Sequence, residues 1–306
     1  MEKKNISFSK LVKAELVKCS YGCKECKRAQ LYGMLLYSNI NVEDRVILQT
    51  QQRNVANIIA DYLYQLEKVK TNIVSTESLL CKGDVIYTVE IQNNNDLEKL
   101  CNKYNLLLAD QIDYEFISQI YCLKSFLRGV FLACGVVTNP KTEYHLEFVV
   151  HSKKLSVSLC EALEQFDIMC KSSKRKNSYI VYSKESETVE DMLTLVGATK
   201  SAIEVMNVKI YKEIRNNANR TSNCETANIT KTVNAATSQV NDIILIKDKI
   251  GFDNLSADLV EVANLRLDNP QASLRELCEI TNGKLSRSGL HHRLKRLTDM
   301  AKELKV

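Results

Sequence analysis

Basic and short polar residues gather in the segment SRSGLHHRLKRL near the end of the chain. Leucines recur in it every three or four residues, which predicts a helix with one buried face. The exposed faces would then carry serine, histidine and arginine in the first turns of the helix and further basic side chains in the following turns. The first group suits contacts with the edges of DNA bases, and the second suits contacts with phosphates. The predicted DNA-binding residues are Ser286, Arg287, Ser288, His291, His292, Arg293, Lys295 and Arg296.

Within this set, Arg287, Ser288, His291 and His292 are the candidates for base contacts. The three later basic residues are expected to contact DNA phosphates, and such contacts position a protein without specifying the DNA sequence. Two other interpretations stay open for a basic helix of this kind. It could be a solvated face of a small bundle, or it could contact an acidic protein.

Three cysteines in CSYGCKEC, namely Cys19, Cys23 and Cys26, are the second chemical candidate. A zinc site needs a fourth ligand and usually pairs two such clusters. Neither Cys81 nor the isolated His145 and His151 stands at a motif spacing. We therefore expect packed or redox-sensitive thiols here and no metal. No cofactor is expected either, because no Gly-Lys-Ser/Thr sequence follows the glycines.

Turn and capping signals before the basic helix predict a helix-turn-helix domain over 256–306. A first helix at 256–268 would stop at Asn269-Pro270. Ser273 and Glu276 form a capping-box pattern that opens a second helix, and Asn282-Gly283 should end it. Ser286 is then the expected N-cap of the basic helix.

Composition limits the class of protein. The chain has 306 residues, a net charge of +5, and 45% hydrophobic residues. Apolar runs are too short to span a membrane, and the first residues lack the features of a secretory signal. The 11 cysteines, an odd number, favour a reducing cytoplasm over a disulfide framework. Residues 1–28 and 284–306 each carry a charge of +5.

A repeat of about a hundred residues organises the rest of the chain. Gly33 and Gly129 lie 96 positions apart, in the apolar segments LYGMLLYSN and LRGVFLACG. Each segment precedes the order β-β-α-β-β-α, with strands expected at 39–42, 45–51, 71–75 and 84–91 in the first copy. In the second copy, strands are expected at 135–137, 144–150, 166–170 and 179–183. Each half therefore reads αββαββα.

This unit resembles the LAGLIDADG homing-endonuclease fold. The resemblance rests on Leu31 and Gly33 in the first segment, and on Leu127, Gly129, Ala133 and Gly135 in the second. It implies that the two motif helices pack closely, with an acid ending each one to bind a divalent metal. Ser38 and Cys134 stand at those acid positions, and neither replaces a carboxylate on Mg²⁺. We expect the fold without the nuclease, hence no catalytic residues.

Nearly the whole chain resembles the WhiA family of bacterial transcription regulators. The motifs are SFSKLVKAEL, RGVFLACGVVTNP with YHLEF, NCETANITKT, and LSRSGLHHRLKRL. The resemblance implies a degenerate LAGLIDADG domain joined to a helix-turn-helix. It also implies roles in sporulation, cell-division or chromosome-segregation genes of Gram-positive bacteria, and a cytoplasmic, nucleoid-associated location. Double-stranded DNA is the expected partner, with another regulator or RNA polymerase as further candidates.

The expected fold class is α+β, a duplicated αββαββα domain followed by an all-α helix-turn-helix domain. The expected parts are a basic segment at 1–20, the LAGLIDADG-like domain at 21–215 with repeats at about 21–110 and 121–215, a linker and connecting helix at 216–255, and the helix-turn-helix at 256–306. The asparagine-rich stretch 215–222 is the linker candidate, with a helix opening at Ser222. An active site-specific endonuclease and a protein-binding scaffold with weak DNA affinity remain the alternative functions.

Overall fold

The computed structural model describes residues 7–19, 23–77, 84–117 and 119–305, and Cys81 lies outside them. The chain divides into two compact units, Met1–Lys212 and Glu213–Val306. Each unit has a hydrophobic core of its own. No described helix is long and apolar enough to cross a membrane.

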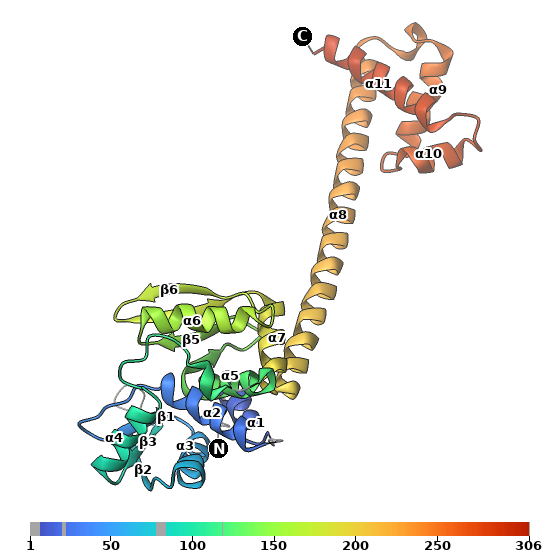
Figure 1. Cartoon of the computed structure of the whole chain (residues 1–306). Helices are drawn as coiled ribbons and strands as arrows, with labels where there is room; N and C mark the ends of the chain where they lie inside the picture. Colours follow the sequence, from blue (N-terminus) through green and yellow to red (C-terminus); the bar gives the residue numbers. More distant parts are fainter. Residues whose placement is uncertain (1–6, 20–22, 78–83, 118, 306) are drawn as a thin grey trace. The chain divides into compact units, whose positions relative to one another are not determined.

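Two apolar helices form the centre of the first unit (Figure 1). They are α2 (Lys24–Leu36) and α5 (Ile120–Cys134), and they pack against each other. Glycine is required at the contact, because a Cβ atom on Gly33 would lie 2.3 Å from the Phe126 carbonyl oxygen. A Cβ atom on Gly129 would lie 2.2 Å from the Gln30 carbonyl oxygen. The predicted close approach of two motif helices is therefore confirmed.

The first repeat continues into an antiparallel sheet of three strands in the order β1-β3-β2. Its elements are β1 (Val46–Thr50), α3 (Arg53–Tyr62) running into the short π-helix η1 (Leu63–Glu67), β2 (Thr71–Glu77), β3 (Val85–Ile91) and α4 (Asn94–Lys103). The strand predicted at 39–42 is wrong. Only an isolated bridge joins Asn41 to Val46, because the Asn41 side chain bonds Asp44 and turns the chain at once.

The second repeat builds a sheet of four antiparallel strands in the order β4-β5-β7-β6. Its elements are η2 (Tyr114–Phe116) before α5, then β4 (Gly135–Val137), β5 (Leu146–Val150), α6 (Lys153–Glu164), β6 (Lys171–Arg175), β7 (Ser178–Ser183) and α7 (Ser186–Val196). The strand predicted at 166–170 is misplaced. Ile168 packs in the core after a left-handed turn at Asp167, and the real strand is a polar, exposed edge.

The described part of the expected N-terminal basic segment, residues 7–19, belongs to the first unit. Helix α1 (Phe8–Leu16) places Phe8, Val12 and Leu16 on one face, and all three are buried in the core of the first unit. This spacing of four residues is that of a helix packing on a neighbour. The same helix carries Glu15, whose carboxylate accepts from the backbone amides of Lys200 and Ser201 at 2.7 and 3.1 Å.

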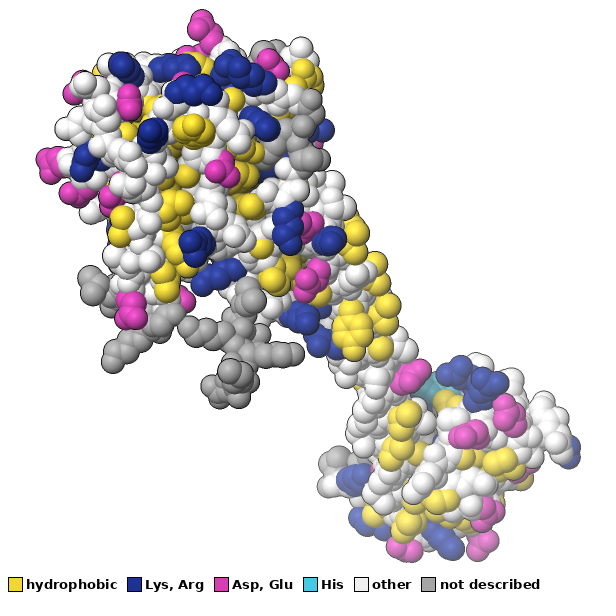
Figure 2. Space-filling model, turned by 90° about the horizontal axis from the view of Figure 1, so that it is seen from below, with side chains coloured by type: hydrophobic (Ala, Val, Ile, Leu, Met, Phe, Trp, Pro, Cys, Tyr) yellow, Lys and Arg dark blue, Asp and Glu magenta, His cyan; other side chains and the backbone are white. Residues whose placement is uncertain are grey.

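The stretch predicted as a linker is helical. Helix α8 (Thr199–Lys249) runs through residues 215–222 without a break, so a helix start at Ser222 is wrong. The capping pattern at Ser222 has no effect here because no glycine or proline interrupts the preceding turns. Exposed apolar side chains lie along the N-terminal part of α8 (Figure 2), among them Ile210, Tyr211 and Ile214.

The second unit is entirely helical. After α8 come η3 (Phe252–Asn254), α9 (Ala257–Asp268), α10 (Leu274–Ile280) and α11 (Arg287–Glu303). Ile243 and Ile246 of α8 join the core of these helices. The capping box of Ser273 and Glu276 is present as predicted, with hydrogen bonds of 3.2 and 2.7 Å. The architecture is the predicted α+β class, a duplicated domain followed by a helix-turn-helix.

Candidate nucleic-acid interface

Helix α11 separates an apolar face from a basic one. Its buried side chains are Leu290, Leu294, Leu297 and Ala301, each at most 1% exposed. These residues pack against α9 and α10, so the remaining faces of α11 point outward. The first acid in the helix is Asp299, which leaves its N-terminal turns basic and polar. That half suits a polyanion.

The turn before α11 fixes where the helix begins. Asn282 and Gly283 adopt left-handed backbone angles, with φ of 51° and 75°, and end α10. Ser286 is the N-cap of α11, and its hydroxyl accepts from the Gly289 amide at 3.1 Å. Ser286 thus acts first as a helix cap. The turn presents the first residues of α11 at the surface.

Seven of the eight predicted DNA-binding residues are exposed: Ser286, Arg287, Ser288, His291, His292, Lys295 and Arg296. Arg293 is the exception. Its guanidinium is half-buried and pairs with Asp258 of α9, with an Nε–Oδ2 distance of 3.2 Å. This ion pair joins α9 to α11, and the Arg293 guanidinium is less exposed than the other predicted DNA-binding residues.

A groove of about 400 Å³ beside the start of α11 is lined by basic residues, two of which were not predicted from the sequence. Arg287 and His291 line it together with Lys231 of α8 and Arg275 of α10. Arg275 lies in the first turn of α10 and pairs with Glu279 of the same helix, with an Nε–Oε1 distance of 3.1 Å. Lys231 lies 56 positions before Arg287, so no local pattern could have found it.

The C-terminal ends of the motif helices lack the carboxylates that hold a divalent metal. Ser38 is 4% exposed, and its hydroxyl donates to the Leu35 carbonyl at 3.0 Å. Cys134 is the last residue of α5, and its thiol donates to the Val130 carbonyl at 3.5 Å. Burial raises the pKa of the Cys134 thiol to about 12, so it is neutral near pH 7.

A lysine lies beside Cys134, and sequence reasoning missed it. The ammonium of Lys13, on α1, donates to the Leu132 carbonyl at 3.1 Å and interacts electrostatically with Cys134. Burial lowers the pKa of Lys13 to about 8. A cationic side chain at this end of α5 repels a second cation, so the local field opposes divalent metal binding.

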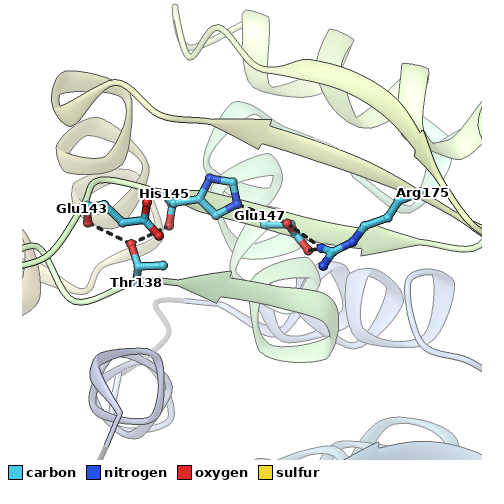
Figure 3. A network of polar contacts seen from close by, with 5 residues as sticks. All are labelled: Thr138, Glu143, His145, Glu147 and Arg175. Carbon is cyan, nitrogen blue, oxygen red and sulfur yellow. Dashed lines mark hydrogen bonds and ion pairs between the residues drawn. The ribbon is translucent and has the colours of Figure 1, made fainter.

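The four-stranded sheet offers a second, weaker basic surface. Its edge strand β6 exposes Lys171, Lys174 and Arg175. Figure 3 shows that Arg175 bonds Glu147 of β5, with N–O distances of 3.0 and 3.2 Å, and that His145 contacts the same carboxylate at 3.1 Å. Glu147 therefore offsets part of the basic charge, and His145 belongs to this polar network.

Comparisons with known proteins cover both units. A family model described as the WhiA LAGLIDADG-like domain matches residues 123–215, and one described as the WhiA C-terminal HTH domain matches residues 218–301. A protein of Clostridium novyi named probable cell division protein WhiA is 36% identical over 98% of this chain and 99% of its own. A relative of the same name from Clostridium botulinum is also 36% identical, with the same coverage.

A solved structure of a WhiA protein agrees in fold with this chain. Full-length DUF199/WhiA from Thermatoga maritima matches with a TM-score of 0.58 and 25% identity, covering 97% of this chain and 99% of that one. The order of a LAGLIDADG-like unit followed by a helix-turn-helix is thus shared along the whole length. The chain belongs to the WhiA family.

Proposed function

We propose that this protein is a sequence-specific DNA-binding transcription regulator whose nuclease-like unit does not cleave DNA. The observation that carries this proposal is the capped, exposed and acid-free N-terminal half of α11, supported from behind by a leucine stripe. Ser288 and His292 lie on the exposed side, and Arg287 and His291 flank it beside the groove. These four side chains reach base edges in the major groove.

Phosphate contacts surround this reading surface. Lys295 and Arg296 follow on α11, and Lys231 and Arg275 line the groove together with Arg287 and His291 in the same unit. Such contacts position the helix and supply the salt-dependent part of the affinity. The relatives are named as cell-division proteins, and we propose division genes as targets, with sporulation genes as a second class and the nucleoid as the site of action.

A gel-shift series with genomic fragments tests this function. At rising salt, a sequence-specific regulator keeps a preferred set of fragments after bulk binding has collapsed. The proposal of sequence-specific binding is wrong if all fragments are released at the same salt concentration. That result would favour a scaffold that touches DNA weakly.

The absence of cleavage follows from Ser38, Cys134 and Lys13. A hydroxyl and a neutral thiol replace the two carboxylates, and an ammonium lies beside the second position. Mg²⁺ prefers oxygen ligands with negative charge, so it has no site of that kind here. Incubation of purified protein with supercoiled DNA and Mg²⁺ should leave the DNA intact. Metal-dependent nicking that follows the protein through several columns would contradict this.

A further inference from the structure

Three cysteine thiols meet at the N-terminal ends of the two motif helices. Cys23 and Cys26 come from the start of α2, and Cys122 comes from the first turn of α5. Their three sulfur atoms all lie within 4.8 Å of one another. Among the described residues, no other group of His, Cys, Asp or Glu side chains brings three ligand atoms this close.

The duplication of the fold explains how two of these thiols meet. Cys26 and Cys122 are separated by 96 positions, the same interval as Gly33 and Gly129, so they are equivalent residues of the two repeats. Each precedes its glycine by seven residues, about two helical turns, and so lies on the same face of its helix. The close glycine contact therefore draws the two thiols together.

Cys23 completes the group from the loop before α2. It is the N-cap of the helix, and its sulfur accepts from the Cys26 backbone amide at 3.2 Å. The sulfur atoms of Cys23 and Cys26 are 3.1 Å apart. In the metal-free protein the hydrogen bond between the Cys23 and Cys26 thiols raises the Cys23 pKa, although the Cys26 amide acts in the opposite direction, so a metal ion must displace the thiol protons when it binds.

Cys19 does not belong to this group, although the sequence places it in the same motif. Its thiol points to the Gly197 carbonyl at 3.5 Å. The local run of cysteines thus supplies two ligands, and the third comes from the other repeat, which spacing along the chain does not reveal.

We propose that Cys23, Cys26 and Cys122 form a thiolate site for a soft metal ion of the zinc class. Zinc–sulfur bonds of about 2.3 Å place tetrahedral sulfur ligands roughly 3.8 Å apart. That value lies between the 3.1 Å separation of the Cys23 and Cys26 sulfurs and the 4.8 Å limit of the cluster, so metal binding moves the two nearer sulfurs slightly apart. Thiolates select such ions over Mg²⁺. Binding releases the thiol protons, and water or the nearby Glu25 carboxylate, which bonds the Cys23 thiol, fills the fourth position.

The bound ion would join the first turns of α2 and α5 and so stabilise the first unit. This role is independent of the proposed DNA binding, because the cysteines belong to the first unit and the helix-turn-helix to the second.

Cobalt(II) titration of the reduced full-length protein tests the site. We expect one Co²⁺ per chain, thiolate-to-cobalt charge-transfer absorption and the visible bands of tetrahedral Co²⁺, all displaced by added Zn²⁺. The variant C23S is the sharpest probe, because serine is a good N-cap and preserves the start of α2 while removing one thiolate. Its affinity should fall by more than the roughly 10–100-fold that loss of a group supporting a metal ligand costs.

C101S is the matched control, since Cys101 is buried like Cys122 but lies outside the cluster. It should bind Co²⁺ as the wild type does, whereas C122S should not, with folding of each variant checked by circular dichroism. The proposal fails if C23S binds Co²⁺ with the wild-type affinity and spectrum. It also fails if the reduced wild-type protein shows no thiolate absorption, or if mass spectrometry finds a Cys23–Cys26 disulfide in that preparation.

Discussion

Lys13 and Cys134 are an unusual pair for the end of a helix that resembles a metal-binding one. Burial disfavours the charged form of both, so it lowers the pKa of Lys13 to about 8 and raises that of Cys134 to about 12. Near neutral pH the pair therefore consists of a cationic amine and a neutral thiol. A carboxylate introduced at position 134 would form an ion pair with this ammonium, and this pairing would compete with the binding of a metal ion.

The pH dependence of stability should reveal Lys13. Its folded pKa of about 8 lies below the ordinary value of 10.5, so between these two values the unfolded chain binds more protons. Lys13 therefore makes stability rise with pH across that window. We expect the stability difference between wild type and K13M to shift in favour of the wild type from pH 8 to pH 9.

Urea unfolding of both proteins at pH 7, 8 and 9 measures this difference. Cys134 acts in the opposite direction around and above its ordinary pKa of 9.0, but both proteins contain this thiol, so its own contribution cancels in their difference. A difference that stays constant over the three pH values would mean that the folded pKa of Lys13 is not lowered.

Arg287 and Lys295 should differ in what their loss does to DNA binding. Arg287 lies in the first turn of α11 beside the groove, where a guanidinium can contact a base edge. R287A should cost about 1–3 kcal/mol on preferred fragments and little on others, which relaxes specificity. K295A should weaken binding to all fragments alike and reduce the slope of affinity against salt by about one.

Gel shifts of both variants over the same fragments and salt series make the comparison. Glu303, exposed near the end of α11, supplies a control, because E303A removes no base and should not weaken binding. If R287A and K295A bind like wild type, α11 does not read DNA.

At the scale of elements, the two glycines set the distance between α2 and α5. A methyl group at Gly129 would overlap the Gln30 carbonyl, a backbone atom that cannot move aside without the helix. G129A should therefore force the helices apart and destabilise the first unit by about 1–3 kcal/mol.

Thermal unfolding measures this cost, which corresponds to a fall in Tm of roughly 2–12 °C for a unit of this size. K124A, at an exposed site on the same helix, is the matched control and should change Tm little. An equal Tm for G129A and wild type would show that the helices do not pack through this glycine.

Helix α8 makes a different prediction, because residues 215–222 look like a linker but are helical. Trypsin cleaves segments that can unfold locally, and a continuous helix resists it. Arg215 and Arg220 should therefore be cut slowly in the native protein. N219P should break the helix, since proline costs about 3 kcal/mol inside one, and expose both sites. Rapid cleavage after Arg215 in the wild type would show that α8 is not a continuous helix at residues 215–222.

Periodic apolar spacing made most elements predictable, and the exceptions have physical causes. The helices around Gly33 and Gly129 and the capped helices of the second unit follow local patterns. Strand β6 is an exposed edge and therefore has no alternation of apolar and polar residues. The sequence pattern predicted this strand at residues 166–170 instead, where apolar residues precede it. In the candidate sites, the helix caps and the exposed basic residues could be predicted from local sequence. Lys13 and Cys122 could not, because they reach Cys134 and Cys26 only through tertiary packing.

At the scale of the whole molecule, the chain divides into two units, each with a hydrophobic core of its own. The core of the first unit contains the motif helices, and the core of the second contains the leucines behind α11. The two family models meet at the same region, one ending at residue 215 and the other beginning at 218. Each unit thus has what an independently folding domain needs.

We therefore expect a fragment of residues 213–306 to fold alone and to keep the preference for the DNA fragments that the full chain selects. The residues proposed to contact base edges, the groove and the core of the second unit all lie within these limits. Residues 1–212 should bind DNA without that preference, through exposed bases such as those on β6. Gel shifts of both pieces and the full chain, after circular dichroism has shown each piece to be folded, measure the division. If residues 1–212 alone select the same fragments, sequence is read by the nuclease-like unit, and α11 serves mainly to hold the complex on the phosphate backbone.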